Sequence, residues 1–156
     1  MVVLLQQDAE QLLRLGLAAA CGAAVGLNRL HGRRAHRGRL RVHVLVALSA
    51  CLLTLAAGPQ ADATSRAIQG VAAGVGFLGA GEILLEPHHG KQGRPAVHGL
   101  TSAAAIWFTA ALGVTVAGSK PFLVITALAL ALLTLSGHHS KRSNSSDPAP
   151  PTPSRA

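Results

Sequence analysis

The sequence predicts an all-α membrane protein, a polytopic bundle of about five transmembrane helices. The first observation is composition: 49% of the 156 residues are apolar and only 13% are charged. A soluble domain of this size usually carries about 25% charged residues. The second observation is that the apolar residues form long runs without the period-two alternation of a transmembrane barrel. Because lipid cannot satisfy exposed backbone amides, helices are the structure that remains.

Five apolar segments are the expected helices, and all are rich in Ala, Leu and Gly. They are Leu12 to Leu27, Val42 to Ala57, Ala67 to Leu85, Leu100 to Ala117, and Pro121 to Leu135. A spanning helix needs about 17–25 residues, so several segments must recruit flanking residues to cross. The first segment also carries a charge, Arg14, near its start.

The basic residues predict how these helices are oriented, because Lys and Arg accumulate in short cytoplasmic loops. Most of them fall on one side: Arg29, Arg33, Arg34, Arg37, Arg39, Arg41, Lys91, Arg94, Lys141, Arg142 and Arg155. Arg14, Arg66 and Lys120 fall on the other side. We therefore expect the amino terminus outside and the carboxyl terminus in the cytoplasm. The first residues carry Asp8 and Glu10 without a positive region, which is not typical of a cleaved signal peptide.

Residues 1–137 are thus expected to form a transmembrane domain, and residues 138–156 a disordered polar tail rich in Ser and Pro. No soluble carboxy-terminal domain is expected. The histidine pairs at 88–89 and 138–139 do not make a metal site, because neighbouring histidines alone provide no coordination shell. Cys21 and Cys51 lie inside apolar segments and are expected to act as small apolar residues. We expect no catalytic residue, metal or cofactor.

Glycines are the most informative residues for helix packing. In lipid, small residues let helix backbones approach closely. The expected packing glycines are Gly22, Gly26, Gly70, Gly74, Gly76, Gly79 and Gly81, of which Gly22 with Gly26 and Gly70 with Gly74 form GxxxG pairs. Two interpretations stay open: a packed bundle without any site, and a bundle whose packing also holds polar groups in a useful geometry.

Polar residues at the helix ends are expected to meet in the cytoplasmic leaflet. They are Asn28, Arg29, Arg41, His43, Glu82, His98, Thr101 and Ser102. A charge inside the membrane costs about 2.5–3.5 kcal/mol and is usually paired, so Arg41 is the expected partner of Glu82. The alternative is a Glu82 carboxylate that faces water at headgroup level. His43 is either a group that titrates near neutral pH or a capping or lipid-facing side chain.

Three ordered blocks resemble the MgtC/SapB family of bacterial inner-membrane proteins. They are VGLNRLHGRRAHRGRLRVHVLVALSACL, SRAIQGVAAGVGFLGAGEIL and HGLTSAAAIWFTAALGVTVAG, and the likeness covers most of Leu12 to Leu135. The most specific parts are GxGFLGAG, from Gly74 to Gly81, and the run from Gly99 to Trp107. The resemblance implies a multi-pass protein linked to magnesium limitation, acid adaptation and, in some pathogens, virulence. It also implies restraint of the F-type ATP synthase rather than transport, and no enzyme activity.

The chain departs from the family pattern at two places. The usual Gly-Leu-Glu-Arg is Gly26 to Arg29 here, with Asn28 in place of the carboxylate. The usual Gly-Leu-Arg-Thr-His is Arg39 to His43, which keeps the Arg and His but loses the Gly and Thr. Glu82 is therefore expected to balance the basic residues. Because no soluble carboxy-terminal domain is expected, the chain resembles the shorter, SapB-like members more.

Two functional hypotheses remain. The first is a regulatory or interaction protein that docks on another membrane protein or on a second copy of itself. The alternative is an ion or small-solute transporter, in which a broken glycine-rich helix and Glu82 line a pathway. In both, the loop from Arg29 to Arg41 is expected to attract anionic lipid by charge, at about 1 kcal/mol per basic residue. A loop tethered at the membrane does not suit a nucleic-acid binder.

Overall fold

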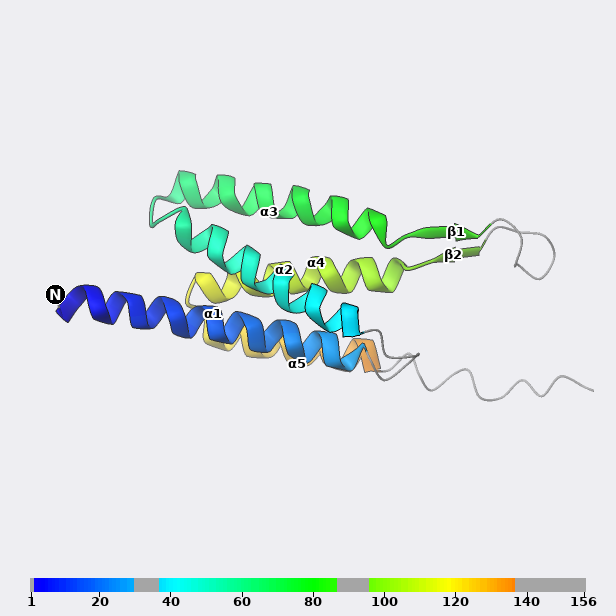
Figure 1. Ribbon diagram of the computed structural model, residues 1–156, viewed down its shortest axis with the longest axis horizontal. Coiled ribbons are helices and arrows are strands. Elements are labelled where there is room, and N and C mark those ends of the chain that lie inside the picture. Colours follow the sequence, from blue (N-terminus) through cyan, green and yellow to red (C-terminus); the bar gives the residue numbers. More distant parts are fainter. Residues whose placement is uncertain (1, 30–36, 87–95, 137–156) are drawn as a thin grey trace, which may run out of the picture.

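Five helices make up the bundle in the computed structural model (Figure 1), which describes residues 2–29, 37–86 and 96–136. They are α1 (Val2–Asn28), α2 (Arg37–Ala56), α3 (Ala61–Gly81), α4 (Leu100–Ala117) and α5 (Pro121–Ser136). Consecutive helices run in opposite directions along the bundle. The predicted tail, residues 138–156, the centre of the Arg29–Arg41 loop and both histidine pairs lie outside the described residues. The predicted all-helical bundle is confirmed.

The third predicted segment, Ala67 to Leu85, was wrong at both ends. Helix α3 starts six residues earlier and ends at Gly81, and the chain then forms β1 (Leu84–Glu86). This strand pairs antiparallel with β2 (Ala96–His98), with Leu85 opposite Val97. The helix closes with a tightened turn in which the Glu82 N–H donates to the Gly79 carbonyl at 3.1 Å. The short hairpin then supplies hydrogen-bond partners for the backbone of the segment that hydropathy alone assigned to a helix.

The core lies where α1, α2 and α4 meet. Its buried residues are mostly small, among them Ala18, Cys21, Ala47 and Cys51, and Leu112 is the largest fully buried side chain. Helix α5 packs against α1 and α4, and α3 packs against α4 and the adjoining part of α2. Both cysteines are buried free thiols, as predicted.

Arg14 ties α1 to α4 at the end of the bundle away from the hairpin. Its Nη1 donates to the carbonyl oxygen of Ala117 at 2.7 Å, and its Nη2 pairs with Glu10 one turn earlier. The last carbonyls of a helix have no partner within that helix, so the guanidinium satisfies one of them. These two contacts explain how the first apolar segment accommodates the charge of Arg14.

Among the described residues, three helices are long and apolar enough to cross a membrane: Leu5–Asn28, Gly38–Ala56 and Leu100–Ala117. Helix α5 is apolar but shorter. Helix α3 has the length, with 21 residues, but its first half carries Asp62, Arg66 and Gln69. Large apolar side chains cover the outside of the bundle, for example Leu13 and Phe122. This surface suits lipid, and the chain is a helical membrane protein.

Candidate functional site

Helix ends gather at the hairpin end of the bundle (Figure 1). Helices α1 and α3 finish there, and α2 and α4 begin there. The predicted polar residues at those ends, including Asn28, Arg29, Glu82 and Thr101, therefore do gather at one end of the molecule.

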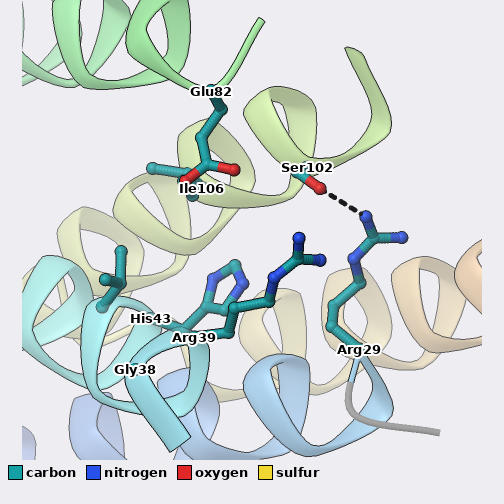
Figure 2. Close-up of a pocket in the computed structure, with 8 residues that line it drawn as sticks. Arg29, Gly38, Arg39, His43, Glu82, Ser102 and Ile106 are labelled. Atoms are coloured by element: carbon teal, nitrogen blue, oxygen red, sulfur yellow. Dashed lines mark hydrogen bonds between the residues drawn. The ribbon is translucent and has the colours of Figure 1, made fainter. Parts of the chain in front are cut away.

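An open pocket of about 250 Å³ lies among these helix ends. It is lined by Arg29, Gly38, Arg39, Val42, His43, Glu82, Ser102 and Ile106. Figure 2 shows that the side chains of Arg39 and Glu82 point toward the same space from α2 and from the end of α3. Two guanidinium groups and one carboxylate thus share a small volume with an imidazole and a hydroxyl.

Arg29 follows the last residue of α1 and reaches across to α4. Its Nη2 donates to Ser102 Oγ at 2.8 Å (Figure 2). Burial lowers the pKa of the Arg29 guanidinium, the charge of Arg39 lowers that pKa further, and the Glu82 carboxylate opposes both effects. The two arginines are therefore close enough to repel each other.

Glu82 ends α3 and is half-buried, with its carboxylate directed into the pocket (Figure 2). Within the described ranges, the one ion pair joins Arg14 and Glu10, so Glu82 has no basic side chain at ion-pair distance. Arg41, its predicted partner, is exposed and does not line the pocket. Two residues along a helix turn about 200°, so Arg39 and Arg41 point to opposite sides of α2. Arg39 takes the place expected for Arg41.

His43 is buried between α2 and α4, with only 4% of its surface exposed. Its Nδ1 lies 3.0 Å from Thr109 Oγ1, and that hydroxyl donates to the Ala105 carbonyl at 2.8 Å. Because the single hydroxyl proton is already used, Nδ1 donates, and a neutral imidazole leaves Nε2 as an acceptor. His43 is thus neither a capping nor a lipid-facing side chain.

The remaining predicted polar residues have separate roles. Asn28 Nδ2 donates to Ser136 Oγ at 2.9 Å, which joins the ends of α1 and α5. Thr101 is exposed and lies outside the pocket. The His98 backbone pairs with Leu84 in the hairpin. Sequence reasoning missed Arg39 and Thr109. The signal that could have identified them is the side of its own helix on which each residue lies.

The predicted packing glycines divide into two groups. A Cβ on Gly22 would lie 2.6 Å from the His43 carbonyl oxygen, and one on Gly26 would lie 3.1 Å from the Leu40 Cα, so both let α1 and α2 approach closely. Gly79 is also packed, with Ala103 about 3.6 Å from such a Cβ. The others, Gly70, Gly74, Gly76 and Gly81, meet nothing within 4 Å in the described part of the chain. Their predicted role in packing within the bundle was wrong.

Two glycines that were not predicted make closer approaches. Gly113 of α4 lies against the Ala47 carbonyl of α2, where a Cβ would overlap the oxygen. Gly99, just before α4, has φ 96° and would overlap the Glu82 carbonyl if it carried a Cβ. Neither glycine has a neighbour at GxxxG spacing, so this spacing does not mark them as packing residues.

No group of three or more His, Cys, Asp or Glu that could hold a metal ion occurs in residues 2–29, 37–86 and 96–136. The charges in the pocket also disfavour a divalent cation, since two guanidiniums face one carboxylate there.

Comparison with known proteins identifies the family. Residues 15–143 match the MgtC family, which is most of the chain. The chain belongs to the MgtC family. Protein SrpB of Synechococcus elongatus is 46% identical over 133 residues, which cover 80% of this chain and 72% of SrpB. The resemblance inferred from the three sequence blocks is confirmed.

Two further relatives have names connected with magnesium or with the family itself. The putative magnesium transporter YhiD of Escherichia coli is 35% identical over 142 residues, and protein MgtC of Salmonella typhimurium is 34% identical over 104 residues. The aligned part spans 61% of YhiD and 41% of MgtC, so both relatives are considerably longer than the region they share with this chain. No solved structure matches. The chain is a membrane protein of the MgtC family, and none of these names denotes an enzyme.

Proposed function

We propose that this chain is a multi-pass regulatory protein of the bacterial inner membrane that acts by docking on another membrane protein. The proposal links it to growth under magnesium limitation or to acid stress, as the family resemblance implies. Its Arg-rich end, with the pocket, faces the cytoplasm. The loop between Arg29 and Arg41 contacts anionic lipid there.

The outward face of α3 is the observation that carries this proposal. Successive helix residues turn by about 100°, so residues 70, 74, 77 and 81 form one stripe. That stripe, which we call the α3 face, consists of Gly70, Gly74, Phe77 and Gly81, and all four are exposed. The opposite side of α3 carries the buried residues Val71, Val75 and Gly79. The α3 face therefore points away from the bundle.

A small-residue stripe suits a partner helix because it removes the side chains that would keep two backbones apart. Phe77 is 82% exposed, so a partner that fits over the glycines would also cover a large apolar side chain. The occupant that we propose is a transmembrane helix of a second protein, and the F-type ATP synthase is the first candidate from the family resemblance. Self-association is the competing outcome.

The test is crosslinked co-purification from native membranes with Gly74→Leu and the matched control Gly76→Leu. Both glycines have open space around them in the described residues, so neither change disturbs the bundle. Position 76 lies about 200° from position 74 around the helix, outside the α3 face. We expect Gly74→Leu to lose most of the captured partner and Gly76→Leu to retain it. Equal capture by both variants, or capture of a second copy only, would contradict the proposal.

Transport is the second candidate, favoured by the name of YhiD and by a polar pocket that contains Glu82. The measurement is magnesium flux into liposomes that contain the purified protein alone. We expect no flux above that of empty liposomes, because the pocket carries more positive than negative groups. Flux that Glu82→Gln abolishes would replace the regulatory proposal with transport.

A further inference from the structure

We propose that the pocket at the hairpin end is a binding site for a phosphate group, held by the guanidiniums of Arg29 and Arg39. The phosphate is carried by a lipid headgroup or is free in solution. The site does not depend on the α3 face, since no residue of that face lines the pocket.

The balance of charge in the pocket favours an anion. Two guanidiniums, one just after the end of α1 and one in α2, line the pocket together with one carboxylate, and neither forms an ion pair in the part of the chain that the structure describes. The hydrogen bond that fixes Arg29 is made to a neutral hydroxyl, Ser102 Oγ, so this bond does not neutralise the positive charge. An anion between two guanidiniums removes their repulsion, and phosphate oxygens match the fork of N–H donors that each guanidinium presents.

The backbone around the pocket favours an anion as well. Gly38, in the first turn of α2, lines the pocket without a side chain, and Ser102 lies in the first turn of α4. The first N–H groups of a helix lack partners within the helix and favour anions. The carboxyl ends of α1 and α3 also reach this region, but Arg29 follows the end of α1 and offsets its negative partial charge.

The lining also has an apolar part, which favours a ligand that has an apolar portion next to its phosphate. Val42 and the buried Ile106 complete the wall next to the charged groups. A lipid would place its phosphate between the arginines and its glycerol and upper acyl chain along this wall. A free phosphate would use the charged part alone, so the two sources predict different affinities for the same arginines.

Arg41 provides a matched control for Arg39. The two residues lie on the same helix, carry the same charge and are both exposed, but Arg41 does not line the pocket. Arg39→Gln and Arg41→Gln therefore change the charge of the protein equally and differ only in the side of α2 that they alter.

The experiment measures binding to the purified full chain in a neutral detergent, by native mass spectrometry and by thermal stabilisation. The probes are dioctanoyl phosphatidic acid, dioctanoyl phosphatidylglycerol, zwitterionic dioctanoyl phosphatidylcholine and inorganic phosphate. We expect one saturable site for an anionic probe. Loss of one guanidinium should weaken that site by about tenfold or more in Arg39→Gln and Arg29→Gln, with no change in Arg41→Gln.

Glu82→Gln should act in the opposite direction and is a second independent variant. Removing the one carboxylate in the pocket should tighten anion binding several-fold, whereas a cation site would lose its ligand. Displacement of the lipid by inorganic phosphate at similar concentration identifies free phosphate as the ligand, and lipid binding without displacement identifies a headgroup.

Three results would overturn the site. Equal weakening by Arg39→Gln and Arg41→Gln would show diffuse attraction to the basic loop instead of a pocket. Weaker binding in Glu82→Gln would assign the pocket to a cation, and the absence of saturable binding by any anionic probe would exclude a phosphate site. Gly74→Leu should leave anion binding unchanged, which separates this outcome from that of the docking proposal.

Discussion

His43 and Thr109 join α2 to α4 through a buried hydrogen bond between the imidazole Nδ1 and the threonine Oγ1, 3.0 Å apart. The pair lies next to the pocket, since His43 is one of its lining residues. The same threonine oxygen donates to its own helix at Ala105, so one hydroxyl fixes both the tautomer and the position of the imidazole. The contact between the two helices should therefore contribute measurable stability.

Thr109→Val keeps the shape of the side chain and removes the hydroxyl. We expect the free energy of unfolding in detergent to fall by about 0.6–1.7 kcal/mol, the range found for hydrogen bonds between membrane helices. Thr115→Val is the matched control, because the Thr115 hydroxyl donates to Ala111 of its own helix and has no partner on another helix among the described residues. An equal loss in both variants would mean that the hydrogen bond to His43 contributes nothing specific.

Gly22→Ala should separate α1 from α2. The added Cβ would lie 2.6 Å from a backbone oxygen of His43, which cannot rotate away, so we expect a loss of about 1–3 kcal/mol in thermal or denaturant unfolding. Gly16→Ala, on the same helix, meets nothing within 4 Å among the described residues. That control should be neutral or more stable by up to about 1 kcal/mol, because Ala has the higher helix propensity.

Gly99→Ala should disrupt the connection between the hairpin and α4. Its φ of 96° is costly for any residue with a Cβ, and the Cβ would also overlap the Glu82 carbonyl. Gly58→Ala isolates the first effect, because Gly58 has φ 75° and only a flexible Gln60 side chain near it. We expect the Gly99 variant to lose clearly more stability in thermal unfolding than the Gly58 variant. Similar losses in both variants would mean that the contact with the Glu82 carbonyl does not contribute to the loss of stability.

The charges of Arg29 and Glu82 should be coupled, whereas those of Arg41 and Glu82 should not. A double-mutant cycle with Arg29→Gln and Glu82→Gln should give a coupling energy of about 0.2–1 kcal/mol, smaller at high salt, since the groups are partly exposed. The cycle with Arg41→Gln should be additive within about 0.3–0.5 kcal/mol. Coupling in the second cycle and additivity in the first would restore Arg41 as the partner.

The orientation is tested by a cytoplasm-active reporter fused after Leu135. Helix α5 ends at the same end of the bundle as α1, beside the basic residues, so we expect an active fusion. A reporter fused after Gly58, at the opposite end, is the matched control and should be inactive. The reverse pattern would place the pocket outside the cytoplasm.

Much of the fold could be predicted from the sequence because the partition of apolar runs into lipid, which dominates the folding of such a chain, depends on composition. Helix α4 has the predicted bounds, and α5 extends only one residue further. The end of α3 could not be predicted in this way, because Leu84 and Leu85 are as apolar as the helix before them. Only their pairing with β2 across the hairpin makes them a strand.

The helix ends that form the site could be predicted, and the predicted residues Arg29, His43, Glu82 and Ser102 line its pocket, whereas Arg39 was missed. Whether Arg39 or Arg41 enters the pocket depends on how α2 is rotated about its own axis. The two residues lie about 200° apart around the helix, so only one of them can face the pocket. The glycines also show that a sequence pattern does not determine which side of a helix is packed. GxxxG spacing identified Gly22 and Gly26, but it also selected Gly70 and Gly74, which have no neighbour within 4 Å in the described residues.

Arg14 in α1 and Arg29, just after its end, set the position of α4 along α1. Arg14 contacts Ala117, Arg29 contacts Ser102, and each pair of contact points is separated by the same fifteen residues along its own helix. Both helices therefore present matching intervals of about 22 Å, at 1.5 Å per residue. A slip of one helical turn, about 5.4 Å, would break both contacts at once. The hydrogen bonds of Arg14 and Arg29 together set the register of the two antiparallel helices. Apolar packing is not directional and by itself specifies this register only weakly.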